Sequence, residues 1–145
     1  MINSSDVNVL SVGPVDEHQK ALADIVRRNP TGRLACCLGV EAALPALRSS
    51  RVPVVLCDSQ LNWRQLLDQL RGLPEPPFLI VTSRLADDRL WSEALNLGAY
   101  DVLAKPFDAN EVTRVLAMAW MRWSGRSTKP FRQARRQQLM EAVYA

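Results

Sequence analysis

Short apolar runs alternate with longer segments of helical periodicity along this chain. Five runs rich in apolar and β-branched residues predict strands, at 7–12, 34–38, 52–57, 78–82 and 101–104. The segments between them carry apolar residues three and four positions apart, a spacing that places side chains on one face of a helix. The pattern therefore predicts strands and helices in strict alternation, with a last helix after the fifth strand.

The predicted helices have recognisable start and stop signals. Asp16 is an expected N-cap, with Gln19 three residues later completing a capping-box pattern, and Gly98 is an expected left-handed helix end. Pro45 lies in a helix predicted over about 41–49, where it is tolerated near the first turn. The buried stripes predicted for the other helices are Ala21, Leu22, Ile25 and Val26; Trp63, Leu66, Leu67 and Leu70; Leu90, Trp91, Ala94 and Leu95; and Val112, Val115, Leu116, Ala119 and Trp120.

Near-continuous apolar strands indicate a sheet that is covered on both faces, as in parallel α/β folds. In such a doubly wound sheet the chemistry gathers at the carboxyl ends of the strands. The residues that follow the predicted strands are Gly13 and Pro14, Asp58, Thr82 to Arg84, and Lys105. We therefore expect a carboxylate, a hydroxyl and an ammonium group to meet at one edge of the sheet.

Composition narrows the class of protein. The chain has 145 residues, of which 48% are hydrophobic and 23% charged, as in one soluble globular domain. No apolar run approaches the roughly 20 residues that span a bilayer, and the first residues lack a secretory signal pattern. We interpret Cys36, Cys37 and Cys57 as buried free thiols of a cytoplasmic protein. A single histidine, His18, excludes most histidine-based metal sites and makes a Ser-His-Asp triad improbable.

The net positive charge of the chain comes from its C-terminal residues. Residues 125–145 hold five basic residues against Glu141, whereas the other 124 residues hold 13 basic and 14 acidic ones. We therefore expect a domain over 1–124 and a basic linker or C-terminal helix over 125–145. A nearly neutral domain does not imply nucleic-acid binding.

Three stretches of the chain resemble the receiver domain of two-component response regulators. The sequence Gly-Ala-Tyr-Asp-Val-Leu-Ala-Lys-Pro-Phe over 98–107 is similar to the signature before the family's last helix. Residues 55–58 and 80–83 resemble the strands that end in the phosphoacceptor aspartate and in the hydroxyl residue. The resemblance covers about residues 7–123. It implies the flavodoxin-like receiver fold, a five-stranded parallel sheet in the order 2-1-3-4-5.

The resemblance also implies a role in phosphorelay signal transduction. Asp58 would accept a phosphoryl group as a carboxylate nucleophile, Thr82 would donate its hydroxyl to that group, and Lys105 would pair with both. The Lys105–Pro106 bond would be cis. The implied partner is a histidine kinase or another signalling protein. Catalysis would be limited to self-phosphorylation and self-dephosphorylation at Asp58.

The chain departs from the family pattern at the metal site. Family members carry two acids directly after the first strand, and these hold Mg²⁺ together with the phosphoacceptor, whereas this chain has Gly13 and Pro14. With Asp58 as the one matching ligand we expect a weak or absent Mg²⁺ site and no other cofactor. Asp16 is better explained as a helix cap than as a replacement ligand. We therefore expect an atypical receiver that also acts through contacts independent of phosphorylation.

Four residues are candidates for those contacts. Val102 stands where the family has an aromatic switch residue, and the nearest aromatic is Tyr100. Trp120 and Trp123 lie three apart on the last predicted helix. Either Trp120 is core and Trp123 covers the helix end, or both belong to a partner or homodimer surface. An effector domain after residue 145 is a further expected partner.

Two other functions stay open at this stage. The first is a conventional, Mg²⁺-dependent phosphorylatable receiver. The second is a nucleotide-binding α/β enzyme, which is disfavoured because no glycine-rich loop follows the first strand and Pro14 removes an amide donor there.

Overall fold

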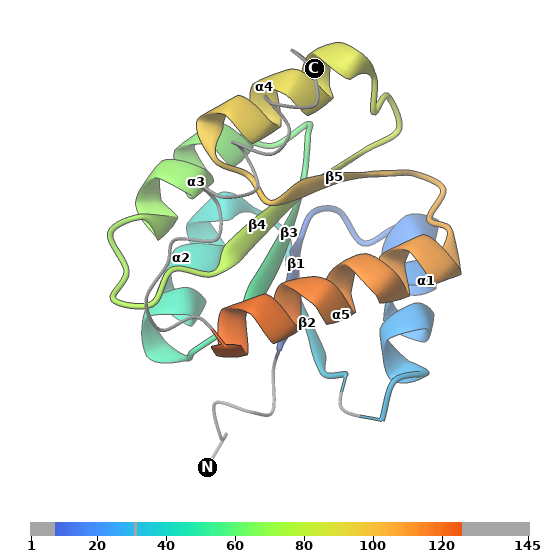
Figure 1. Ribbon diagram of the computed structural model, residues 1–145, viewed down its shortest axis with the longest axis horizontal. Coiled ribbons are helices and arrows are strands. Elements are labelled where there is room, and N and C mark those ends of the chain that lie inside the picture. Colours follow the sequence, from blue (N-terminus) through green and yellow to red (C-terminus); the bar gives the residue numbers. More distant parts are fainter. Residues whose placement is uncertain (1–7, 31, 126–145) are drawn as a thin grey trace.

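The five predicted strands form one parallel sheet in a computed structural model that describes residues 8–30 and 32–125 (Figure 1). The strands are β1 (Val9–Val12), β2 (Leu34–Cys37), β3 (Val54–Asp58), β4 (Phe78–Ser83) and β5 (Asp101–Ala104). Their order is β2-β1-β3-β4-β5 and every pairing is parallel. The predicted fold class and strand order are confirmed.

Helices cover both faces of this sheet. They are α1 (Glu17–Arg27), α2 (Val40–Ser49), α3 (Trp63–Leu70), α4 (Asp88–Leu97) and α5 (Ala109–Gly125). Figure 1 shows α1 and α5 on one face and α2, α3 and α4 on the other. None of the helices described over 8–30 and 32–125 is long and apolar enough to cross a membrane.

The two faces hold two separate hydrophobic cores. Side chains alternate along a strand, so Val54 and Leu56 of β3 pack toward α1 and α5, whereas Val55 and Cys57 pack toward α2 and α3. Every residue of β3 and β4 is buried, because these central strands are covered on both sides. Burial raises the pKa of Cys57 to about 12, with a further contribution from Asp58, so this thiol stays protonated.

Several helix ends match their sequence signals. The Asp16 carboxylate accepts a hydrogen bond from Gln19 N at 3.0 Å, and Asn62 and Asp87 cap α3 and α4 in the same way. Gly98 ends α4 with φ of 112°, a left-handed conformation that a side chain disfavours. The predicted cap at Asp16 and the predicted helix end at Gly98 are thus confirmed, because each depends on neighbouring residues alone.

Some predicted core positions are wrong. Ala21 is exposed, and the side chains of Trp91 and Trp120 are 37% and 44% exposed. Trp91 and Trp120 lie at the margins of their helical stripes, where the sheet no longer reaches them. Cys36 is exposed and Cys37 half-buried, because β2 is an edge strand with a neighbour on one side alone.

Pro45 lies in the second turn of α2, beyond the first turn near which a proline is expected to be tolerated. Proline removes the hydrogen bond to the carbonyl four residues earlier. That carbonyl belongs to Glu41, which is exposed to solvent, so the helix continues through the proline. The predicted basic linker or helix over 125–145 lies outside the described residues, apart from Gly125.

Candidate functional site

Asp58, Thr82 and Lys105 lie together at the carboxyl edge of the sheet. Asp58 is the last residue of β3 and pairs in register with Thr82 of β4. Ser83 pairs with Ala104 of β5, so Lys105 leaves the sheet at the same level. All three residues line one small cavity, of about 10 Å³. The parallel register thus brings side chains from three separate parts of the chain into one place.

A buried ion pair joins the carboxylate and the ammonium group. Lys105 Nζ donates to Asp58 Oδ2, and both side chains are more than nine-tenths buried. The other oxygen, Oδ1, accepts a hydrogen bond from Gln60 N at 2.8 Å. Buried charges need such partners, because burial removes the water that would otherwise solvate them. The Lys105–Pro106 bond is cis, as the resemblance implies.

Hydrogen bonds between the loop after β3 and the end of β4 fix this edge of the sheet. Ser59 N donates to the Thr82 carbonyl at 2.8 Å, and Ser59 Oγ donates to Ser83 Oγ at 2.8 Å. Ser83 Oγ also accepts from Leu85 N at 3.0 Å. These contacts hold Asp58 and Thr82 in their places beside the cavity.

Gly13 and Pro14 also line the cavity and contribute no side-chain oxygen. A Cβ atom on Gly13 would lie 3.3 Å from Asp58 Cβ and 4.0 Å from Asp58 Oδ2. A side chain at this position would therefore begin directly beside the Asp58 carboxylate.

Asp16 is a second carboxylate beside the cavity. The hydrogen bond from Gln19 N is the main cause that lowers the pKa of Asp16, and the charges of Lys105 and His18 act in the same direction. Within residues 8–30 and 32–125 no group of three or more His, Cys, Asp or Glu side chains could hold a metal ion. Arg84 is exposed and is not among the residues that line the cavity.

Two cavity residues, Ser11 and Gln19, were missed from the sequence. Ser11 is the one polar residue in β1, and this could have been a signal. Gln19 was interpreted as half of a capping box, but its side chain does not complete one. Gln19 Oε1 instead accepts a hydrogen bond from Ser11 Oγ at 2.6 Å. This contact joins residues eight positions apart, which no local helix pattern encodes.

The four candidate interaction residues differ in exposure. Tyr100 is 1% exposed and stacks on Phe78 with ring centroids 4.9 Å apart, and Val102 is also buried. Because both side chains are buried in this conformation, their assignment to an interaction surface stays a prediction that burial does not support. Trp120 is largely exposed, which excludes the core interpretation.

Trp123 covers the end of α5, as one of the two interpretations has it. The side chain is half-buried, and Nε1 donates to the Pro76 carbonyl at 3.2 Å. The Arg51 guanidinium lies 5.0 Å from the ring centroid, within the range of a cation–π contact. The His18 side chain is mostly buried, with its ring edge-on to Phe107.

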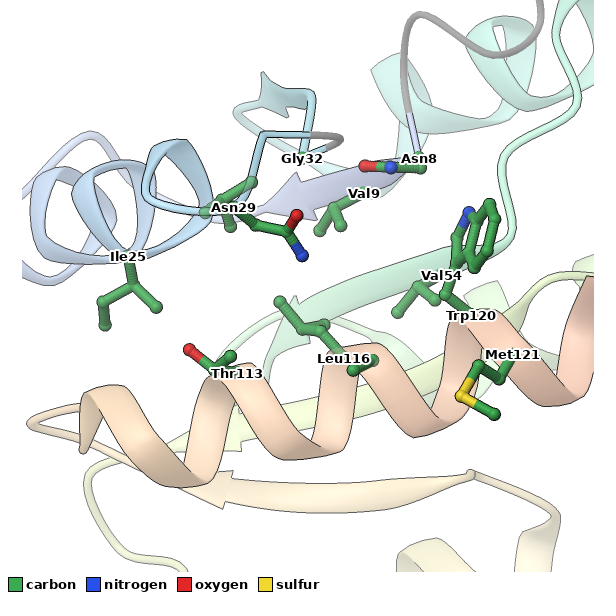
Figure 2. Close-up of a pocket in the computed structure, with 12 residues that line it drawn as sticks. Asn8, Val9, Ile25, Asn29, Gly32, Val54, Thr113, Leu116, Trp120 and Met121 are labelled. Atoms are coloured by element: carbon green, nitrogen blue, oxygen red, sulfur yellow. The ribbon is translucent and has the colours of Figure 1, made fainter.

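A larger cavity lies between α1 and α5 (Figure 2). Its volume is about 130 Å³, and Val9 and Val54 place it at the amino ends of β1 and β3. The polar lining residues are Asn8, Asn29 and Thr113, and none of the lining residues is charged. This cavity therefore lacks the titratable side chains that line the smaller cavity at the carboxyl edge of the sheet. The cavity beside Asp58 is the better candidate site.

Comparison with known proteins agrees with this architecture. A family model described as response regulator receiver domain matches residues 9–117. The signal receiver domain of an HD domain-containing protein from Pseudomonas fluorescens Pf-5 is similar in structure, with a TM-score of 0.71 and 22% identity. That match covers 83% of this chain and 98% of the other.

Two further relatives are informative. The receiver domain of Ssk1 from Saccharomyces cerevisiae, solved with the histidine phosphotransfer protein Ypd1, gives a TM-score of 0.70 at 16% identity over 81% of this chain and 91% of the other. A protein-glutamate methylesterase/protein-glutamine glutaminase from Desulfotalea psychrophila is 28% identical over 123 residues. That match covers 79% of this chain, which spans 33% of the length of the relative.

Proposed function

This chain belongs to the response regulator receiver domain family of two-component signalling, and on that premise we propose that it is a receiver module with Asp58 as its phosphoacceptor. The observation that carries the proposal is the convergence of Asp58, Thr82 and Lys105 on one cavity. A carboxylate nucleophile, a hydroxyl donor and a cation are three of the groups that support phosphoryl transfer to an aspartate.

The proposed step is an in-line displacement at phosphorus. A carboxylate oxygen of Asp58 forms the new O–P bond, while the bond from phosphorus to the donor's imidazole nitrogen breaks and that nitrogen keeps the electron pair and takes up a proton. Lys105 would neutralise negative charge on the phosphoryl oxygens, and Thr82 would donate its hydroxyl to one of them. Water later attacks phosphorus, the bond to the Asp58 oxygen breaks, and inorganic phosphate leaves the restored carboxylate.

We further propose that the Mg²⁺ site of this receiver is impaired. Gly13 and Pro14 supply no carboxylate beside Asp58. The two acids that do line the cavity are both engaged, Asp58 with Lys105 and Gln60 N, and Asp16 with Gln19 N. Mg²⁺ prefers several hard oxygen ligands in near-octahedral geometry, so this donor set does not fit it well.

An impaired metal site favours a role that includes phosphorylation-independent contacts. The proposed upstream partner is a histidine kinase or a phosphotransfer protein, in keeping with the Ypd1 complex of the similar Ssk1 domain. Exposed Trp120 on α5 supports a homodimer or an effector surface there, since aromatic residues are frequent anchors of interfaces. The proposed compartment is the cytoplasm.

The experiment is incubation with phosphoramidate, with and without Mg²⁺, followed by intact-mass measurement. We expect slow gain of one phosphoryl group, weakly dependent on Mg²⁺, that is lost in Asp58→Asn. The matched control is Asp68→Asn, because Asp68 is an exposed acid on α3 and its replacement should leave the gain intact. Fast gain that requires Mg²⁺ would identify a conventional receiver instead, and a gain that persists in Asp58→Asn would refute the assignment.

A further inference from the structure

One polar atom of the Gln19 side chain is buried without a protein partner. Gln19 Oε1 is held by Ser11 Oγ at 2.6 Å, and Ser11 is itself buried. Among the described residues, no group accepts a hydrogen bond from Gln19 Nε2, although this atom is shielded from solvent. Burial of an amide donor is unfavourable unless an acceptor reaches it.

Exchange of the nitrogen and oxygen positions in the Gln19 amide still leaves one of the two atoms buried without a partner. A serine hydroxyl both donates and accepts, so Ser11 could hold either atom, and the other would then be buried without a partner. The carboxylates of Asp16 and Asp58 line the same cavity. Their negative charge favours the orientation in which the NH₂ group, and not the carbonyl oxygen, faces the cavity.

The position of Gln19 relative to Asp58 indicates what the amide binds. Both residues line a cavity of about 10 Å³, which accommodates roughly one oxygen-sized group. Lys105 is the one cation among the ten residues of that lining. An anion attached to Asp58 would therefore find Lys105, the Thr82 hydroxyl and the Gln19 amide as neighbouring donors.

We propose that Gln19 Nε2 donates a hydrogen bond to an oxygen of the phosphoryl group on Asp58, and that Ser11 fixes the amide for this contact. The inference rests on the proposed phosphoacceptor role of Asp58. One phosphoryl oxygen occupies the cavity and the others lie at its mouth. The amide is a neutral donor that stabilises the anion beside Gly13 and Pro14, which carry no acid to hold a metal ion.

The first test compares Gln19→Met with wild type in the phosphoramidate reaction. Methionine keeps the length of the side chain and removes both polar atoms. We expect the rate of phosphoryl gain at Asp58 to fall at least about tenfold, since loss of one donor to a developing oxyanion costs roughly 10²–10³ in other enzymes. Gln69→Met on the exposed face of α3 is the matched control and should react at the wild-type rate.

The second test leaves Gln19 unchanged and separates a contact from a merely structural role. The side-chain NH₂ resonances of Gln19 are followed by ¹⁵N NMR during phosphorylation of the wild-type chain. We expect them to shift in step with the mass change and to stay constant in Asp58→Asn. Constant resonances in a fully phosphorylated sample, or an unchanged rate in a folded Gln19→Met, would overturn the inference.

A wild-type chain that gains no phosphoryl group would refute the proposed function rather than the amide contact itself. The same resonances are then followed during titration with inorganic phosphate. A saturable shift that is lost in Lys105→Met supports an anion position beside Gln19. Absence of any shift up to high phosphate concentration overturns it.

Discussion

The ion pair between Asp58 and Lys105 dominates the site at the scale of single residues. Both side chains are almost completely buried, so neither charge retains much hydration. The hydrogen bond from Gln60 N satisfies the second oxygen of the carboxylate. In this setting each charge depends on the other, and removal of one leaves the other without compensation.

Replacement of Lys105 by methionine should therefore destabilise the fold. We expect a loss of about 3 kcal/mol in the free energy of unfolding, because the Asp58 carboxylate loses its cation. Urea denaturation measures the loss, and Lys20→Met on the exposed face of α1 is the control. Asp58→Asn combined with Lys105→Met should recover part of the stability. Equal stability of the two lysine variants would contradict the argument.

The contribution of Asp16 to the stability of the fold, at the start of α1, depends on pH. Its pKa in the folded chain is lowered, mainly by the hydrogen bond from Gln19 N. The carboxylate therefore stabilises the fold above its unfolded pKa, about 3.9, and this contribution is lost as the pH falls through the lower folded value.

Asp16→Ala should cost about 1 kcal/mol at pH 7, the usual value of a helix cap, and this difference should shrink below pH 4. Thermal unfolding of both proteins from pH 2 to 7 measures it. Asp16→Asn is the control because asparagine caps a helix without titrating, so its stability should depend less on pH than that of wild type. A pH-independent gap between Asp16→Ala and wild type would be inconsistent with this account.

At the scale of elements, α5 presents two different apolar faces. Val112, Val115 and Ala119 are buried against the sheet. The neighbouring face, with Thr113, Ala117 and Trp120, lines the cavity beside α1 (Figure 2). Its packing against α1 is incomplete, because a cavity of about 130 Å³ lies between the two helices.

A larger apolar side chain at position 117 should improve this packing. We expect Ala117→Leu to stabilise the fold by about 1 kcal/mol, since the new methyl groups fill space already lined by apolar side chains. The midpoint of urea unfolding measures the effect. Ala42→Leu on the exposed side of α2 is the control and should change stability little. Destabilisation by Ala117→Leu would indicate that the space is already occupied.

At the scale of the whole molecule, the two ends of the sheet differ in chemistry. The carboxyl edge gathers Asp58, Thr82 and Lys105, whereas the cavity near the amino ends of β1 and β3 is lined without charge. The gathering at the carboxyl edge follows from the parallel sheet, because every strand points the same way and the carboxyl ends of all strands meet at one edge. A receiver built on this sheet thus has its proposed phosphoacceptor far from the exposed end of α5.

The sequence by itself determined the order of elements, the parallel sheet and the meeting of Asp58, Thr82 and Lys105. The order of elements and the parallel sheet follow from apolar periodicity. The three side chains meet because parallel strands of similar length bring their carboxyl ends to one edge. The caps at Asp16 and Gly98 were also determined locally, since each involves residues of the same turn.

Only the tertiary structure decided which borderline apolar side chains are covered. Tyr100 is buried against Phe78, whereas Trp120 stands exposed although it continues a regular apolar stripe. The tertiary structure also decided that the Gln19 side chain accepts a hydrogen bond from Ser11 instead of completing a capping box. These outcomes depend on neighbours from distant parts of the chain. A periodic pattern in the sequence predicts the face on which a side chain lies, but not which residues pack against that face.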